Sequence, residues 1–267
     1  MTTSTNREVI QQAADTLAGA TASRKPCAPV RDLIGRDDTA AAYLVQAHNI
    51  SARLAAGRTR VGRKVGLTSP AVQRQLGVDR PDFGVLLDDM DCTGSGRLDI
   101  DRLLQPRLEA EIAFVLGADI DESITGQRAP RFVERLHAAF EIVDSRVADW
   151  NISLVDTIAD NASSGLYVLG DELPADSAPD LVAVKMTMSS GGERVSTGKG
   201  SDCLGSPWAA LAWLANTSVE HGAPLRAGEV ILSGALGPMV PVIPGASYTA
   251  SITGIGAVAV AFTSRRA

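Results

Sequence analysis

Residues 108–116 read Leu-Glu-Ala-Glu-Ile-Ala-Phe-Val-Leu, an apolar run interrupted only by two carboxylates, and such a run predicts a buried β-strand. From Gly77 onward, similar short runs alternate with turn residues. They predict strands over residues 140–143, 166–169, 182–188, 194–197, 229–233, 247–253 and 257–263. One clear helix interrupts them, opened by Ser206-Pro207 and closed by Gly222. So many strands with few helices do not suit a doubly wound parallel sheet, and we expect an α+β protein with a mixed or antiparallel β-roll.

The first sixty residues have helical periodicity instead. Apolar side chains recur at helical spacing over residues 9–17, and Gly19 is expected to end that helix. A second helix is expected to begin at residue 37 or 38 and to end at Gly57, and a short one is expected over residues 69–77. We therefore divide the chain into a helical N-terminal region, residues 1–60, and a β-roll domain, residues 61–267.

The composition excludes several function classes. Lysine and arginine number 25 against 31 acidic residues, a net charge of −6 without any basic run, so no nucleic-acid partner is expected. No apolar stretch reaches membrane-spanning length, and the N-terminus lacks the apolar core of a secretory signal, so no membrane association is expected. Cys27, Cys92 and Cys203 fit neither a disulfide framework nor a zinc cage. We expect a cytoplasmic protein with reduced thiols.

Three carboxylates lie in the expected strands. Glu109 and Glu111 are two residues apart, so their side chains point to the same face. Two such carboxylates repel, which is tolerable where they face water, share a proton or hold a cation. With Glu141, which lies in another apolar run, they would form an all-oxygen site suited to Mg²⁺ or Mn²⁺. Asp144 is an alternative third ligand, and the spacing alone is also compatible with a solvated strand face.

Two other stretches contain side chains that suit proton transfer or binding. Lys64 lies in the segment Gly-Arg-Lys-Val-Gly-Leu-Thr at residues 62–68. If Lys64 is buried, its pKa falls and it can exchange protons near neutral pH. A lysine exposed at the surface fits the same pattern. Asp82 is the one acid of a turn-like element, Pro-Asp-Phe-Gly at residues 81–84. Residues 155–165 are rich in small hydrogen-bonding side chains, which is typical of a loop that lines a site and equally of a capped loop.

Other catalytic patterns are absent from the sequence. It has no Gly-x-Ser-x-Gly elbow, and residues 198–200, Gly-Lys-Gly, lack the remainder of a phosphate-binding loop. His48, His137 and His221 all fall in or near expected helices and outside the stretches above. This argues against a histidine-based triad and against a histidine-rich zinc site.

Five segments, taken in chain order, resemble the 2-keto-4-pentenoate hydratase family of the fumarylacetoacetate hydrolase superfamily. They are GRKVGLTSPAVQRQLGVDRPDFG, PRLEAEIAFVL, FEIVDSRVADW, DTIADNASSG and VILSGALGPMVPVIPG. The resemblance extends from about Val61 to Phe262. It implies a mixed β-roll of the fumarylacetoacetate hydrolase type, with the helical N-terminal part on it.

The resemblance also implies a cofactor and a reaction. Glu109, Glu111 and Glu141 stand at the family's metal-ligand positions, and the metal is Mg²⁺ or Mn²⁺. The implied enzyme is a hydro-lyase that adds water to a 2-hydroxy-2,4-dienoate, by way of its 2-oxo-enoate tautomer, and gives a 4-hydroxy-2-oxo acid. Such reactions belong to the meta-cleavage breakdown of aromatic compounds or steroids.

Four further residues stand at positions that the family uses for catalysis or substrate binding. Lys64 is the proton-shuttling lysine, and Asp82 is a second catalytic residue. Ser164 and Leu67 are substrate-binding residues. The family implies a small-molecule dienoate as partner and a homo-oligomer, a pentamer or a decamer, and it allows contact with a decarboxylase or aldolase of the same pathway.

Three rival interpretations stay open. A 4-oxalocrotonate-type decarboxylase shares the lysine, the paired glutamates and the metal; Phe83 favours a hydratase, because the decarboxylases have a tryptophan-containing version of this element. An acylpyruvate C–C hydrolase usually activates water with a His–Glu pair, and no histidine lies in the five segments. A catalytically silent subunit of a hydratase complex is disfavoured, because Lys64 and all three glutamates are retained.

Overall fold

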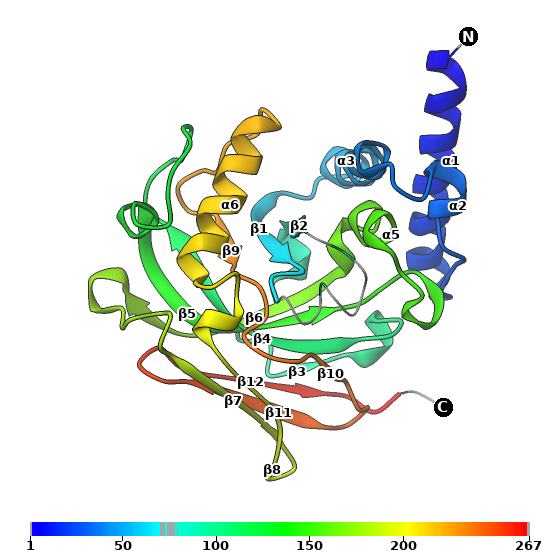
Figure 1. Cartoon of the computed structure of the whole chain (residues 1–267). Helices are drawn as coiled ribbons and strands as arrows, with labels where there is room; N and C mark the ends of the chain where they lie inside the picture. The colour runs from blue at the N-terminus through cyan, green and yellow to red at the C-terminus, as the bar shows by residue number, and fades with distance from the viewer. Residues whose placement is uncertain (1, 70–72, 74–77, 79, 266–267) are drawn as a thin grey trace.

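The computed structural model describes residues 2–69, 73, 78 and 80–265, whose strands form two sheets (Figure 1). The larger sheet has the strand order β2-β1-β9-β4-β5-β6, and β10 pairs with β4. Its strands are β1 (Arg60–Gly66), β2 (Asp82–Leu87), β4 (Arg107–Leu116), β5 (Val133–Val143), β6 (Ser164–Pro174), β9 (Val230–Leu232) and β10 (Val240–Pro241). The smaller sheet, in the order β3-β12-β11-β7-β8, consists of β3 (Arg97–Leu98), β7 (Lys185–Ser190), β8 (Glu193–Lys199), β11 (Ser247–Ile252) and β12 (Gly256–Phe262).

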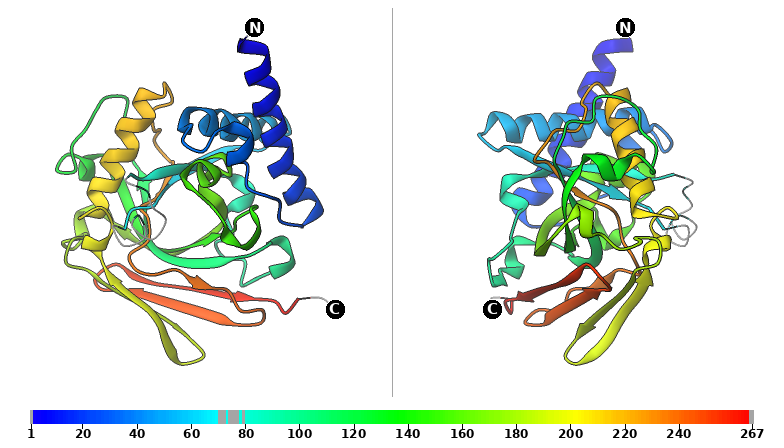
Figure 2. Two further views of the ribbon diagram at one scale, coloured as in Figure 1. Left: turned by 45° about the vertical axis from the view of Figure 1, so that its right-hand side comes forward. Right: turned by 90° about the vertical axis from the view of Figure 1, so that its left-hand side faces the viewer.

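The main core lies between the two sheets. Phe114 of β4 and Phe140 of β5 are fully buried in it, together with Met188 and Phe262 of the smaller sheet. Burying each side chain of this size stabilises the fold by about 1.5–3 kcal/mol. Figure 2 shows the smaller sheet covering one face of the larger sheet in both views. Because successive side chains on a strand alternate between faces, the two glutamates of β4 point away from this core.

Three helices precede the first strand: α1 (Thr2–Ser23), α2 (Arg31–Ile34) and α3 (Thr39–Ala55). The helix α3 begins where the sequence predicts, because the Asp38 side chain caps it by accepting a hydrogen bond from Ala41 N. The predicted end of the first helix at Gly19 was wrong, since α1 continues to Ser23. A glycine costs only about 1 kcal/mol inside a helix, which the packing of α1 on α3 offsets. The N-terminal end of α1 projects from the rest of the molecule (Figure 1).

Among the described residues after β2, α-helices form at two places. The helix α6 (Pro207–Glu220) agrees with the prediction, and the Ser206 hydroxyl caps it by accepting a hydrogen bond from Trp208 N. The Trp208 ring stacks on Phe114 with 4.7 Å between ring centroids, which holds α6 against β4. The short helix α5 (Leu154–Ala159) forms in the stretch that was expected to be a loop. It packs against α3 and so connects the N-terminal helices to the sheet region.

Several predicted elements differ from the structure. The turn-like element that contains Asp82 is the beginning of strand β2, and β2 pairs with β1, for which no strand was predicted. The β1 segment has two glycines and only two apolar side chains, so its strand signal is weak, and Pro81 and Gly84 give the β2 segment the character of a turn. Tertiary pairing decides the conformation of both. The strand β7 begins at Lys185 and not at Val182, and His137 lies in β5 and not in a helix. Most of the helix predicted over residues 69–77 falls outside the described residues.

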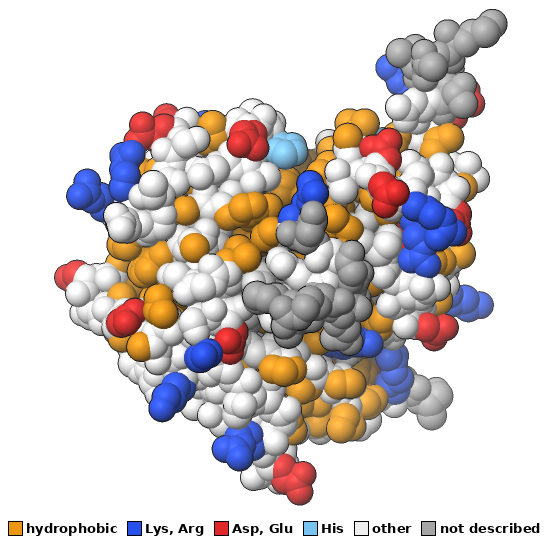
Figure 3. Space-filling model, in the orientation of Figure 1, with side chains coloured by type: hydrophobic (Ala, Val, Ile, Leu, Met, Phe, Trp, Pro, Cys, Tyr) orange, Lys and Arg blue, Asp and Glu red, His pale blue; other side chains and the backbone are white. Residues whose placement is uncertain are grey.

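The α+β class and the mixed sheet are as predicted. The strand β1 runs parallel to β9, whereas β9 and β4, β4 and β5, and β5 and β6 are antiparallel. The division at residue 60 stays a prediction. No helix among the described residues is both long and apolar enough to span a membrane. Cys27, Cys92 and Cys203 are free thiols. Acidic and basic side chains are interspersed over the face shown in Figure 3.

Candidate active site

Three glutamates converge on the face of the larger sheet that points away from the smaller one. Glu109 and Glu111 lie on β4, and Glu141 lies on β5 directly opposite Glu109. One carboxylate oxygen of each lies within 4.8 Å of the other two. Glu111 and Glu141 are buried, and Glu109 is partly exposed. The structure therefore brings together the three carboxylates that the sequence suggested as metal ligands.

These carboxylates hold protons more tightly than usual. Removal from water, and then the charge of Glu141, raises the pKa of Glu109 to about 7. Burial and the two neighbouring glutamates raise the pKa of Glu111 well above its ordinary value. Burial also raises the pKa of Glu141, although Lys64 opposes that effect. Three such groups close together require a proton or a cation to offset their charge.

Lys64 extends from β1 into the same cluster. Its Nζ lies 3.2 Å from Glu141 Oε1, and the side chain is only 3% exposed. Burial by itself would lower the pKa of Lys64, as the sequence predicted, but Glu141, Asp82 and the other two glutamates together hold it above the ordinary value. The predicted lowering of the Lys64 pKa is therefore wrong. The Lys64 ammonium offsets part of the carboxylate charge.

Asp82 completes the group from the first position of β2, directly opposite Gly66 of β1. Burial raises its pKa, and the charge of Lys64 opposes the rise. Its Oδ2 accepts a 3.3 Å hydrogen bond from Thr157 Oγ1 of α5. Its Oδ1 is buried and has no hydrogen-bond partner among the described residues. Asp82 is thus a buried acid near Lys64 with one oxygen held and the other available.

The other residues that the sequence suggested are Ser164, Leu67 and, as the alternative ligand, Asp144. Ser164 begins β6, and its hydroxyl donates a 2.7 Å hydrogen bond to Asn161 O. Leu67 directly follows β1 and has a φ of 58°, a left-handed conformation that leucine rarely adopts. Asp144, the alternative third ligand, accepts hydrogen bonds from two backbone N–H groups of another loop and is not part of the three-glutamate cluster.

Sequence reasoning missed three residues beside the site. Gly234 N donates a 2.7 Å hydrogen bond to Glu111 Oε2 and so holds that carboxylate. Thr157 bonds Asp82, and its Oγ1 lies 3.4 Å from Ser163 Oγ. The many small polar residues at 155–165 were the sequence signal for a site nearby. Their spacing does not show which hydroxyl group contacts Asp82.

The donor set fits a hard divalent cation. Mg²⁺ and Mn²⁺ prefer oxygen ligands, and the cluster consists of carboxylates. Glu111 Oε1 and Glu141 Oε2 are buried and have no hydrogen-bond partner in the described part of the chain. Buried polar atoms are rarely left without a partner, so a bound cation is a physical explanation for these two. We therefore regard the three glutamates as suitable metal ligands.

Residues 93–263 match the model of the fumarylacetoacetate (FAA) hydrolase C-terminal family. The chain belongs to the fumarylacetoacetate hydrolase family. The matched segment contains β4 and β5 with all three glutamates. Lys64 and Asp82 precede this segment.

Two hydratases of this family are similar to the chain over nearly its whole length. A 2-keto-4-pentenoate hydratase of Paraburkholderia xenovorans (strain LB400) is 51% identical over 257 residues, which are 96% of each chain. A 2-hydroxyhexa-2,4-dienoate hydratase of Comamonas testosteroni is 39% identical over 261 residues, which are 97% of this chain and 99% of the relative. The hydratase resemblance drawn from the five segments is confirmed.

A solved structure of the family has nearly the same fold. It is the 4-oxalocrotonate decarboxylase from Pseudomonas putida G7, complexed with magnesium and adipate. The two superpose with a TM-score of 0.91 at 31% identity, covering 96% of this chain and 98% of that chain. The fumarylacetoacetate hydrolase fold is therefore confirmed.

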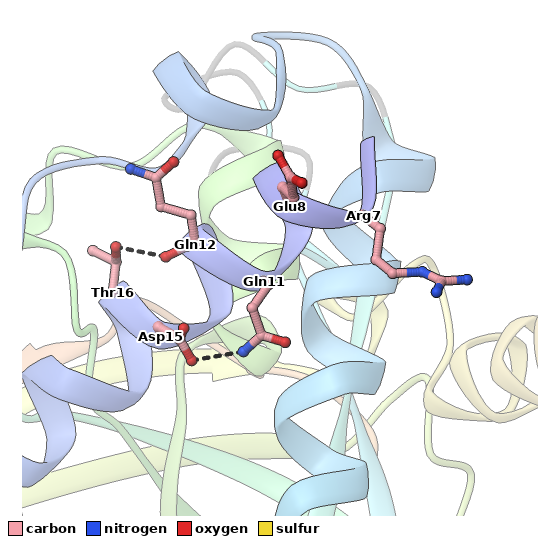
Figure 4. Close-up of a pocket in the computed structure, with 6 residues that line it drawn as sticks. All are labelled: Arg7, Glu8, Gln11, Gln12, Asp15 and Thr16. Carbon is pink, nitrogen blue, oxygen red and sulfur yellow. Dashed lines mark hydrogen bonds between the residues drawn. The ribbon is translucent and has the colours of Figure 1, made fainter. Parts of the chain in front are cut away.

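Two surface hollows lie away from the glutamates. One runs along the exposed side of α1, where Gln11 Nε2 donates to Asp15 Oδ1 and the Thr16 hydroxyl donates to Gln12 O (Figure 4). The other, of about 550 Å³, is lined by α1, α3 and the start of β6 and includes Ser164. None of the three glutamates lines either hollow.

Proposed function

We propose that this protein is a metal-dependent hydratase that adds water to a 2-hydroxy-2,4-dienoate and releases a 4-hydroxy-2-oxo acid. The observation that carries the proposal is the convergence of Glu109, Glu111 and Glu141, with Lys64 Nζ 3.2 Å from Glu141 Oε1. The names of the hydratase relatives support the reaction, and the magnesium in the related decarboxylase supports the cation. The reaction would belong to the meta-cleavage breakdown of aromatic compounds or steroids.

The three glutamates would hold Mg²⁺ or Mn²⁺. A cation at this position would supply Lewis-acid stabilisation of the negative charge that develops on the substrate 2-oxygen. The N–H of Gly234 fixes one oxygen of Glu111 and leaves the other without a protein partner. The chain thus orients a ligand atom before any ion arrives, which lowers the entropic cost of binding.

Lys64 is the residue that moves protons in this proposal. Tautomerisation of a 2-hydroxypentadienoate places a proton on C5 and removes one from the 2-hydroxyl group. Hydration then adds the hydroxyl of water at C4 and a proton at C3. The Lys64 ammonium faces this cluster and can donate the first proton. A cation that offsets the glutamate charges would weaken the interactions that hold the pKa of Lys64 above its ordinary value, and so would favour release of its proton.

Asp82 would orient the attacking water through its free Oδ1, while Thr157 holds Oδ2. Leu67 and Ser164 would contact the substrate, an assignment that rests on their family positions alone. A decarboxylase must accept a second, distal carboxylate. An ionised Asp82 would repel that group by about 1–4 kcal/mol at 4 Å, depending on the local dielectric. This repulsion favours the hydratase over the decarboxylase.

The test supplies purified protein and Mg²⁺ with 2-hydroxypenta-2,4-dienoate and, separately, with 4-oxalocrotonate. We expect loss of diene absorbance with the first substrate and a 4-hydroxy-2-oxo acid as its product. Release of CO₂ from the second at a comparable or faster rate would overturn the assignment in favour of the decarboxylase. A third assay with an acylpyruvate examines C–C hydrolysis.

Three further features belong to the proposal. The family resemblance supports a homo-oligomer, a pentamer or decamer, and contact with a decarboxylase or aldolase of the pathway. Three free thiols support a reducing compartment such as the cytoplasm. Light scattering of the purified protein gives its mass in solution, and a monomer would contradict the first of these features.

A further inference from the structure

Gln46 is a buried polar residue on α3, in the N-terminal helical region. Its Nε2 donates one hydrogen bond of 2.9 Å to Phe83 O and another of 3.1 Å to Ile158 O. Phe83 directly follows Asp82 in β2, and Ile158 directly follows Thr157 in α5. A single amide group therefore joins the backbone of the two segments that contain Asp82 and Thr157.

A hydroxyl contact joins the side chains of the same two segments. Thr157 Oγ1 donates to Asp82 Oδ2 at 3.3 Å and lies 3.4 Å from Ser163 Oγ. Thr157 and Ser163 are both buried, at 4% and 2% exposure, so water does not compete freely for these bonds. With Oδ2 engaged, the rotation of the Asp82 carboxyl group is restricted and the direction of Oδ1 is set.

We infer that Thr157 and Gln46 are positioning residues for Asp82. Thr157 holds one oxygen of the carboxyl group, and Gln46 fixes the distance between the backbone of β2 and that of α5. The consequence is that α3, outside the β-roll, takes part in building the active site. This inference rests on the proposed function, in which Oδ1 of Asp82 orients water.

The first test removes the hydroxyl. We expect Thr157→Val to lower kcat about 10-fold or more and to change KM about 2-fold or less, because orientation of water affects the transition state and not substrate binding. Thr157→Ser keeps the donor and is expected to restore most of kcat. Thr263→Val is the matched control, since Thr263 Oγ1 makes a similar 3.4 Å contact with Asp99 Oδ1 away from the glutamates. The control is expected to keep the wild-type kcat.

The second test asks whether the effect passes through Asp82. In an Asp82→Ala background, Thr157→Val and Gln46→Met are each expected to change kcat by about 2-fold or less, because the group that they position is gone. In the wild-type background each lowers kcat. Equal losses in both backgrounds would show a general structural role and overturn the inference.

A third readout does not depend on activity. Crystal structures of the wild type and of Thr157→Val are expected to show the Asp82 carboxyl group turned or spread over several rotamers in the variant. An unchanged Asp82 carboxyl group would overturn the inference even if the chain proved to lack hydratase activity. If the wild type is an active hydratase and Thr157→Val has the same kcat, the inference is overturned and the proposed function still stands.

Discussion

The absence of a side chain at Gly66 provides the space that the Asp82 carboxyl group occupies. A Cβ at position 66 would lie 2.1 Å from Asp82 Oδ1 and 3.3 Å from Lys64 Nζ. The two residues are direct partners in the β1–β2 pair, so neither strand can move away without losing the pairing. A glycine at this position therefore determines how closely the acid approaches the lysine.

Gly66→Ala is accordingly expected to displace Asp82 and to lower kcat by about 10²-fold, the loss that a misplacement of about 1 Å can cause. The measurement is steady-state hydration of the dienoate with Mg²⁺. Gly19→Ala is the control, because nothing lies within 4 Å of a Cβ there, and it is expected to leave kcat unchanged. It should raise stability by about 0.5–1 kcal/mol, since Gly19 lies inside α1. Full activity of Gly66→Ala would remove Asp82 from the proposed mechanism.

Lys64→Ala is expected to lose about 10²–10⁴-fold in kcat while the protein still folds, since that is the usual contribution of a general acid or base. Lys64→Arg should recover little, because a guanidinium stays protonated near neutral pH. Circular dichroism of each variant checks the fold. Near-normal turnover of Lys64→Ala would place the proton transfer elsewhere, with Asp82 as the first group to examine.

Glu109→Gln and Glu111→Gln are expected to weaken Mg²⁺ binding and to abolish hydration, because each removes a charged oxygen ligand from the cluster. Calorimetric titration with MgCl₂ measures the binding directly. Glu134→Gln, an exposed substitution on the same strand as Glu141, serves as the control and should bind like the wild type. Chelator-treated protein that stays fully active without added divalent ion would contradict the metal assignment.

The metal-free protein is expected to lose stability as pH rises. The pKa of Glu109 is raised from 4.5 to about 7, so the folded state holds this proton more tightly than the unfolded chain does. Its contribution to stability is present below about pH 4.5 and disappears as pH rises through about 7. Mg²⁺ competes with the same proton, so both its affinity and its effect on Tm should increase over this range.

Thermal unfolding between about pH 5 and 8, with and without MgCl₂, measures both effects. Glu109→Gln should flatten the pH dependence of the metal-free protein. A Tm of the metal-free wild type that is constant or increases across this range would contradict the burial of these carboxylates.

The strand β4 was predictable, because its apolar run is interrupted only by two glutamates: it covers Arg107–Leu116 against a predicted 108–116. For β5 only the last part was predicted, residues 140–143 of Val133–Val143. The start of α6 was equally clear from Ser206-Pro207. The strands β1 and β2, which hold Lys64 and Asp82, were not predicted. Their conformation depends on pairing with each other and with β9, more than 160 residues along the chain from Lys64.

The electrostatics of the site could not be predicted for the same reason. The sequence predicted that burial would lower the pKa of Lys64. Four carboxylates from β2, β4 and β5 raise that pKa instead. A local reading of residues 62–68 contains no information about these partners. The contact of Thr157 with Asp82 likewise depends on where helix α5 packs. The six residues of α5 do not by themselves determine that position.

The position of β9 has a consequence for synthesis of the protein. In the larger sheet, β9 (Val230–Leu232) lies between β1 and β4 and pairs with both, so it is the strand that joins Lys64 to the glutamates of β4. The ribosome makes residues 230–232 last among these elements, after every proposed catalytic side chain has already emerged. A nascent chain that ends before residue 230 therefore contains Lys64 and all three glutamates but lacks the strand that pairs with both β1 and β4.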